Sequence, residues 1–303
     1  MPTQNIGFYF FFDLVKENVN TWLREIGVKR LAQNTVIFVE TRDCLRIKQM
    51  LDAFKSLRKK YTNVRILVYD GATGLDPNFD NLSEQISTQS TLQLMPTQRV
   101  SLDVIVNTIL QDLYTQFQRY NSSNRLTPYI IILRNIDFTR NHEGRIPQLE
   151  AIINRWYGDD MIISSYSTML IITVDAENLI RYIMGTTPVI IPPLSTDVER
   201  MKQIREIITK INLDITENDI KRLVELTRGL NLEQIDTLLS EIIVNHGEIN
   251  PNTIANAKMQ LIRQTSALIP VKSDFTFKHV GGYDKIKEYL KLNIIDLILN
   301  RDK

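Results

Sequence analysis

The sequence predicts an α/β protein, with a doubly wound, five-stranded parallel sheet followed by a small all-α domain. Three observations carry this prediction. Five short apolar runs are rich in β-branched residues and mostly lack alternation, which is typical of strands buried on both faces of a parallel sheet. Amphipathic stretches separate these runs, and repeated strand–helix alternation builds a doubly wound layer. After Pro192-Pro193 only helical patterns follow.

The predicted elements of the α/β part follow directly from these periodicities. Strands are expected at residues 35–39, 64–69, 129–134, 168–174 and 188–191. Helices are expected at residues 45–61, 100–120, 146–157 and 176–184. The apolar opening 6–12 predicts either a short strand or the lead-in to a helix that packs on the main body.

The all-α part is predicted from the helical spacing of its apolar residues and from recognisable helix-capping residues. Helices are expected at residues 196–211, 216–227, 231–245 and 251–264. Thr216-Glu217-Asn218-Asp219 has the pattern of a capping box, and Gly229 and Gly247 are candidate helix stops. Residues 266–275 are typical of a linker. The predicted units are therefore 1–192, 193–265 and 266–303.

Composition excludes several classes of protein. The formal net charge of the 303 residues is only +1, so any nucleic-acid surface must be a local patch. The single Cys44 excludes a disulfide framework and a multi-cysteine zinc site, and the low count of three histidines argues against a His-rich metal cage. No apolar run approaches the ~20 residues of a spanning helix, and no signal peptide is recognisable. The expected location is intracellular, in the cytoplasm.

The segment 275–290, Phe-Thr-Phe-Lys-His-Val-Gly-Gly-Tyr-Asp-Lys-Ile-Lys-Glu-Tyr-Leu, resembles the opening of an AAA+ ATPase module. The resemblance implies that Val280, Gly281 and Gly282 build one wall of an adenine pocket. Residues 193–204 are similar to the junction where an AAA+ α/β core meets its lid, and residues 226–235 resemble the lid. The chain ends within an apolar helical stretch, which indicates a fragment of a longer protein; the alternative is a terminal helix that docks back on the body.

Together these segments resemble tandem AAA+ proteins in which a degenerate first module precedes an active second one, including a cyanobacterial and plastid group. The resemblance makes 1–192 a degenerate AAA+-like α/β domain, 193–265 its helical lid, and 266–303 a linker with the start of a second AAA+ module. For the full-length protein it implies an ATPase with ATP and Mg²⁺, a homo-oligomeric ring, and a protein substrate or partner. It implies no membrane partner.

The phosphate-binding elements of that family are missing after the first predicted strand. A P-loop needs glycines that allow close backbone approach, together with a Lys and a Ser or Thr. This chain has Glu40-Thr41-Arg42-Asp43-Cys44-Leu45-Arg46 at that place, with no glycine and two acids. Gly71-Ala72-Thr73-Gly74 follows the second strand and lacks a lysine, so it predicts a turn.

The Walker B position is also degenerate. Arg134 falls where the family's Mg²⁺-holding Asp lies, and Asn135 falls where its water-activating Glu lies. A cation cannot hold Mg²⁺, and an amide cannot accept the proton of the attacking water. Asp137 matches a later, non-catalytic acid, and Asp175 lies at the position of the sensor Asn. We therefore expect no ATP hydrolysis, no catalytic residue, no metal and no cofactor for this fragment alone; a weak, Mg²⁺-independent nucleotide site stays compatible with these residues.

One alternative function is that of a metal-dependent nuclease. Acids follow four predicted strands at Glu40, Asp70, Asp137 and Asp175, and ligands collect at the carboxyl ends of strands in open α/β sheets. Such carboxylates could hold divalent cations for phosphodiester hydrolysis. The alternative role for them is capping of the following helices.

A second alternative is DNA binding by the predicted helix 45–61. Residues 42–65 carry eight basic residues against two acidic ones, and phosphate binding needs such local density. The candidate contacts are Arg46, Lys55, Arg58, Lys59 and Lys60. The competing interpretation is a solvated basic face that pairs with acids on a neighbouring subunit or domain. The preferred function remains an oligomerisation and substrate- or partner-binding platform for an ATPase module that follows this fragment.

Overall fold

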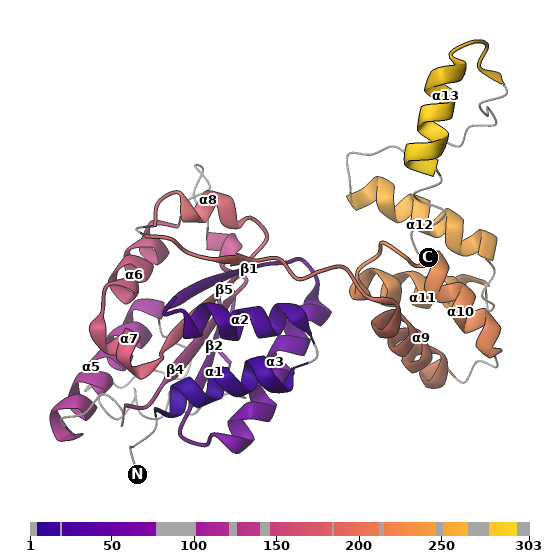
Figure 1. The fold of residues 1–303 in the computed structure, drawn as a ribbon. Coiled ribbons are helices and arrows are strands. Elements are labelled where there is room, and N and C mark those ends of the chain that lie inside the picture. Colours follow the sequence, from indigo (N-terminus) through magenta and orange to yellow (C-terminus); the bar gives the residue numbers. More distant parts are fainter. Residues whose placement is uncertain are drawn as a thin grey trace.

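The computed structural model describes residues 5–18, 20–76, 101–120, 126–139, 146–183, 185–211, 215–246, 251–265 and 279–295 (Figure 1). The predicted linker 266–275, the helix stop Gly247 and the chain end 296–303 lie outside these ranges. Among the described residues, no helix combines the length and the hydropathy that a membrane span requires.

The described strands form one sheet in the order β3-β2-β4-β5-β1-β6. Their bounds are β1 Val36–Glu40, β2 Arg65–Asp70, β3 Gly74–Leu75, β4 Tyr129–Arg134, β5 Thr168–Thr173 and β6 Val189–Ile190. All five predicted strands are present and pair in parallel, which confirms the fold class. The two-residue β3, which pairs antiparallel with β2, is an addition, because a strand of that length has no readable period.

The sheet is buried on both faces, as the unalternating runs predict. Val36 and Phe38 of β1 pack into one core, whereas Ile37 and Val39 pack into the other. Successive strand residues point to opposite faces, so each strand supplies both cores in turn. Trp156 is fully buried in the first core.

Helices cover each face of the sheet (Figure 1). One face carries α1 Ile6–Glu17, α2 Thr21–Leu31 and α3 Cys44–Lys60; the other carries α5 Leu102–Tyr120, α6 Pro147–Tyr157, α7 Asp160–Ser165 and α8 Ala176–Ile180. The apolar opening of the chain is therefore helical. Helices α2 and α7 were not predicted: the charges of α2 blur its periodicity, and α7 has only six residues.

After β6 the described chain is helical, with α9 Asp197–Ile211, α10 Glu217–Leu226, α11 Leu232–His246 and α12 Pro251–Thr265 around a third core. The Oγ1 atom of Thr216 accepts a hydrogen bond from the Asp219 N–H, so the predicted cap is confirmed. Gly229 has a φ of +85° just after α10, the left-handed conformation that a helix-ending glycine adopts. Helix α13 Asp284–Leu290 and a π-helical turn, Lys291–Ile295, follow. The domain boundaries at 192/193 and 265/266 stay predictions.

Candidate functional site

The link from β1 to α3 lies where a P-loop would hold phosphate. Residues 36–60 contain no glycine. The Oγ1 atom of Thr41 accepts the Asp43 N–H at 3.1 Å, and the Oδ1 atom of Asp43 accepts the Leu45 N–H at 3.0 Å. Asp43 is therefore the N-cap of α3. The Asp43 carboxylate thus lies at the N-terminus of α3, the end of a helix that favours an anion.

The start of α3 also touches α11. The Cys44 N–H donates to the Oε2 atom of Glu233 at 3.0 Å, and the Leu232 N–H donates to the Oδ2 atom of Asp43 at 3.2 Å. These two bonds join residues that are 189 positions apart in sequence. Asp43 is buried, and burial together with the Glu233 carboxylate raises the pKa of the Cys44 thiol. This thiol is therefore protonated at neutral pH and is not an activated nucleophile.

Arg46 bridges α3 and the beginning of α9. Both of its Nη atoms donate to the Glu199 carboxylate, and Nη2 also donates to the Pro193 carbonyl at 3.0 Å. Burial alone would raise the pKa of Glu199, but the hydrogen bonds from Arg46 and Thr196 lower it. The Arg46 side chain is only 3% exposed. A buried, bidentate guanidinium is not presented to a phosphate, so this conformation gives no support to the expected contact between Arg46 and DNA, which stays a prediction.

The residues predicted to lie at the Walker B position form a closed cluster at the ends of β2 and β4. The Nε atom of Arg134 donates to the Oδ2 atom of Asp70 at 3.0 Å, and Asn135 Nδ2 donates to the same oxygen at 2.7 Å. Asp70 Oδ1 accepts the N–H of Ala72 at 2.8 Å, within the predicted turn. Burial raises the pKa of Asp70, but these hydrogen bonds and the Arg134 cation outweigh it and lower the pKa.

Gly71 sets the close approach of the β2 and β4 ends. A Cβ atom on Gly71 would lie 2.3 Å from the Asn135 carbonyl oxygen, so only glycine fits without displacement. Asn135 itself adopts a φ of +55°. The backbone therefore directs Asn135 toward Asp70.

The other strand-end acids also hold their own backbone. Glu40 accepts the Ala176 N–H at 3.2 Å, and Asp175 accepts the Asn178 N–H at 3.3 Å as the N-cap of α8. Asp137 accepts the Thr173 hydroxyl at 2.8 Å. Across the described ranges, no group of three or more His, Cys, Asp or Glu side chains is placed to hold a metal ion. These contacts favour the capping interpretation over the nuclease alternative.

The basic residues of α3 are partly engaged. Lys60 forms ion pairs with Asp13 and with Glu17, the second at 2.9 Å. Lys59 is exposed, and Lys55 and Arg58 both have interaction partners. The positive end of α3 is thus in part neutralised by acids of α1, which lies in the same α/β part of the chain and not in a neighbouring subunit or domain.

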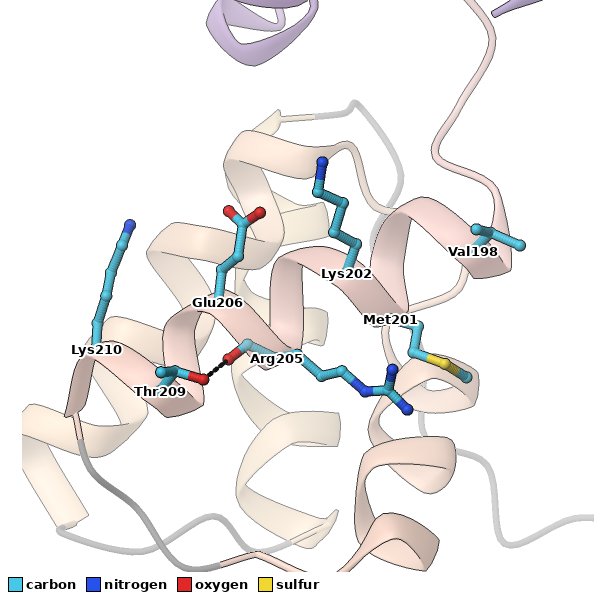
Figure 2. A pocket seen from close by; sticks show the side chains of 7 residues that line it. All are labelled: Val198, Met201, Lys202, Arg205, Glu206, Thr209 and Lys210. Atoms are coloured by element: carbon cyan, nitrogen blue, oxygen red, sulfur yellow. Dashed lines mark hydrogen bonds between the residues drawn. The ribbon is translucent and has the colours of Figure 1, made fainter. Parts of the chain in front are cut away.

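The sequence gives no signal for a groove along α9 (Figure 2). This groove has a volume of about 600 Å³ and is lined by Val198, Met201, Lys202, Arg205, Glu206, Thr209 and Lys210. Arg205 is anchored by an ion pair with Glu217 of α10. Figure 2 shows Lys202 and Glu206 pointing away from Arg205 and Met201 across the helix. An exposed amphipathic helix face of this kind can bind a protein surface.

The expected adenine-pocket residues of a second module are Val280, Gly281 and Gly282. All three are exposed, and a Cβ atom on Gly281 or Gly282 would meet no heavy atom within 4 Å. The described residues therefore form no pocket around them. They precede α13, whose N-cap Tyr283 and whose Ile286 and Tyr289 are exposed as well.

Comparisons with known proteins match both parts of the chain. The family model described as "SpoVK-like AAA ATPase, second domain" matches residues 199–265. A protein of Guillardia theta called "Uncharacterized AAA domain-containing protein ycf46" is 23% identical over 275 residues, which are 89% of this chain and 47% of that protein. Its namesake in Trieres chinensis is 31% identical over 101 residues, 32% of this chain and 20% of that protein. The chain spans less than half the length of these curated relatives.

Two solved structures also resemble the fold. The Walker-type ATPase PABY2304 of Pyrococcus abyssi has a TM-score of 0.47 at 11% identity, covering 80% of this chain and 72% of that one. A chain of the E. coli MS115-1 HORMA:CdnC:Trip13 complex has a TM-score of 0.45 at 12% identity, covering 88% of each chain.

Proposed function

We propose that the chain is a member of the AAA+ ATPase family, which the family model over residues 199–265 and the two curated relatives support. Within that family, it would be a module that does not hydrolyse ATP and that serves as a platform for oligomerisation and for binding a substrate or partner protein. ATP hydrolysis in such a fold needs an acid that holds Mg²⁺, a group that positions the attacking water and a loop that cradles phosphate. This chain has Arg134, Asn135 and Asp43 at those places.

The observation that carries the proposal is the cluster around Asp70. Arg134 and Asn135 both donate to one carboxylate oxygen, at 3.0 and 2.7 Å. A side chain that is held in this way is not available to a nucleotide, and the cation would repel Mg²⁺. The cluster thus supports a structural role for the Walker B position.

A platform also needs an accessible binding surface. The passage from β6 to α9 exposes large apolar side chains, with Ile191 68%, Leu194 61% and Val198 79% exposed. This passage leads into the α9 groove of Figure 2. Contiguous exposed apolar patches are typical of protein–protein interfaces. We propose that this surface, residues 189–210, contacts a second copy of the chain in a ring.

ATP hydrolysis in the whole protein is assigned, by this proposal, to a second AAA+ module that starts within residues 266–303, before α13. ATP and Mg²⁺ would be bound there, with Val280, Gly281 and Gly282 at its adenine pocket. Tyr283, the N-cap of α13, and Ile286 and Tyr289 within α13 are exposed apolar side chains that such a module could cover. The boundaries of the α/β domain, the lid and the second-module start remain those proposed from the sequence, and the cytoplasmic location also stays a prediction.

Self-association can be measured by sedimentation equilibrium over a range of protein concentrations. We expect the chain to associate, and we expect the double variant Leu194→Asp/Val198→Asp to shift it toward monomer at equal concentration. Lys221→Asp, an exposed change on α10, is the control and should associate like the wild type. A wild-type chain that is monomeric throughout would exclude the oligomerisation part of the proposal.

A further inference from the structure

The N-termini of α3 and α11 meet. The first N–H groups of a helix have no partner within the helix, and together with the helix dipole they favour an anion. In α3 the Cys44 N–H is the first of these, and in α11 it is the Leu232 N–H. In nucleotide-binding folds a phosphate fills such a position.

In this chain each helix supplies the anion for the other. Asp43, the N-cap of α3, accepts from Leu232 of α11 at 3.2 Å. Glu233, in the first turn of α11, accepts from Cys44 of α3 at 3.0 Å. Asp43 also caps its own helix through Leu45, so both of its oxygens are used. The two carboxylates therefore satisfy N–H groups on both helices at once.

Arg46 adds a third connection between the same two parts of the chain. Its guanidinium binds Glu199 in a bidentate manner and also binds the Pro193 carbonyl. Glu199 in turn accepts the Thr196 N–H at 2.9 Å, which fixes the start of α9. The polar contacts are thus reciprocal, and Asp43 and Arg46 are almost fully buried.

We propose that the carboxylates of Asp43 and Glu233 take the place of a phosphate as the anions between the α/β core and the helical part. These reciprocal caps, together with Arg46, then hold the N-termini of α3 and α11 in contact without a bound nucleotide. This set of contacts, Asp43–Leu232, Glu233–Cys44 and Arg46–Glu199, is called the carboxylate lock. It goes beyond the platform proposal and does not depend on it, because the lock concerns one chain and would hold equally in a monomer.

Hydrogen exchange of single backbone amides tests the lock. The variant Glu233→Ala removes the acceptor of the Cys44 N–H and leaves the Asp43–Leu232 bond chemically intact. A merely local loss accelerates exchange at Cys44 only. If the lock opens as a unit, exchange at Leu232 accelerates as well, by about tenfold or more, because hydrogen bonds to charged groups contribute that much to a closed state.

Arg46→Met is the second variant, because it removes the ion pair with Glu199 while keeping much of the side-chain volume. It should accelerate exchange at both Cys44 and Leu232. Glu241→Ala, an exposed change on α11, is the matched control and should leave both amides unchanged. Exchange at Ile131 in β4 reports whether each variant keeps its folded core, since this residue is fully buried.

A nucleotide arm completes the experiment. The proposal predicts that millimolar Mg²⁺-ATP leaves exchange at Cys44 and Leu232 of the wild type within twofold. Added protection at these amides would overturn it, since the position would then accept phosphate. Acceleration confined to Cys44 in Glu233→Ala, with Leu232 unchanged in both variants, would overturn it too. Failure of the lock in this way leaves the platform proposal intact, because self-association is measured separately.

Discussion

Replacing Asp70 with Asn should destabilise the α/β core by about 2–3 kcal/mol. The Asp70 side chain is 6% exposed and accepts four hydrogen bonds, from Arg134, Asn135, Ala72 and Thr73. Breaking a buried ion pair usually costs about 3–5 kcal/mol. The Arg134 side chain is 31% exposed and can regain hydration when the pair is broken, so we expect a cost at or below the lower end of that range. The free energy of unfolding is measured by urea titration, followed by the fluorescence of Trp22 and Trp156, which both lie in the α/β core.

The pH dependence of the difference in unfolding free energy between the wild type and Asp70→Asn is a sharper test. The pKa of Asp70 is lower in the folded protein than the ordinary aspartate value of 3.8, so its ionised form stabilises the fold above about pH 4. That stabilisation is lost as the pH falls through the folded-state pKa, and Asp70→Asn lacks it at every pH. The difference in unfolding free energy between the wild type and Asp70→Asn should therefore become smaller from pH 5 to pH 3. Asp52→Asn, an exposed change on α3, is the control. A gap that is constant over this range, or smaller than about 0.5 kcal/mol at pH 7, would refute the reasoning.

Two further changes test the packing and the surface. Gly71→Ala should lower the free energy of unfolding by about 1–3 kcal/mol, because the new Cβ would lie 2.3 Å from the Asn135 carbonyl oxygen. Gly158→Ala is the control, since its Cβ would lie 3.8 Å from the nearest atom, and urea titration should place it within about 0.5 kcal/mol of the wild type. Changing Lys59 and Arg58 to Gln should leave the affinity for a DNA duplex and its salt dependence unchanged; loss of about one unit of slope per removed charge would revive the DNA-binding alternative.

Most of the fold could be predicted because its signals are local. Unalternating apolar runs gave all five parallel strands, and caps such as Thr216 gave the helix starts. Helix α2 was not predicted because charged residues interrupt its apolar spacing, and β3 was not predicted because it has only two residues. The assignment of Arg134 and Asn135 to degenerate Walker B positions depends on residue identity after a recognisable strand, and it stays a prediction.

The contacts between distant segments could not be predicted. Arg46 has the charge of a surface residue, yet it lies four residues before Met50 on the buried side of α3 and meets Glu199, 153 residues away. The bond between Asp43 and Leu232 spans 189 residues, and no periodicity encodes such a pairing. Asp70 was expected to cap or to bind metal; its actual partners, Arg134 and Asn135, follow from strand order, which the sequence does not specify.

The central claim, that this chain does not hydrolyse ATP, is tested most directly by measuring phosphate release from Mg²⁺-ATP by the purified residues 1–303. The account predicts that the wild type releases no phosphate above the buffer background and that Arg134→Ala releases no more than the wild type. Mg²⁺-dependent turnover that persists through purification and disappears when Arg134 or Asp43 is replaced would contradict it, because these residues would then act on nucleotide instead of holding the fold together.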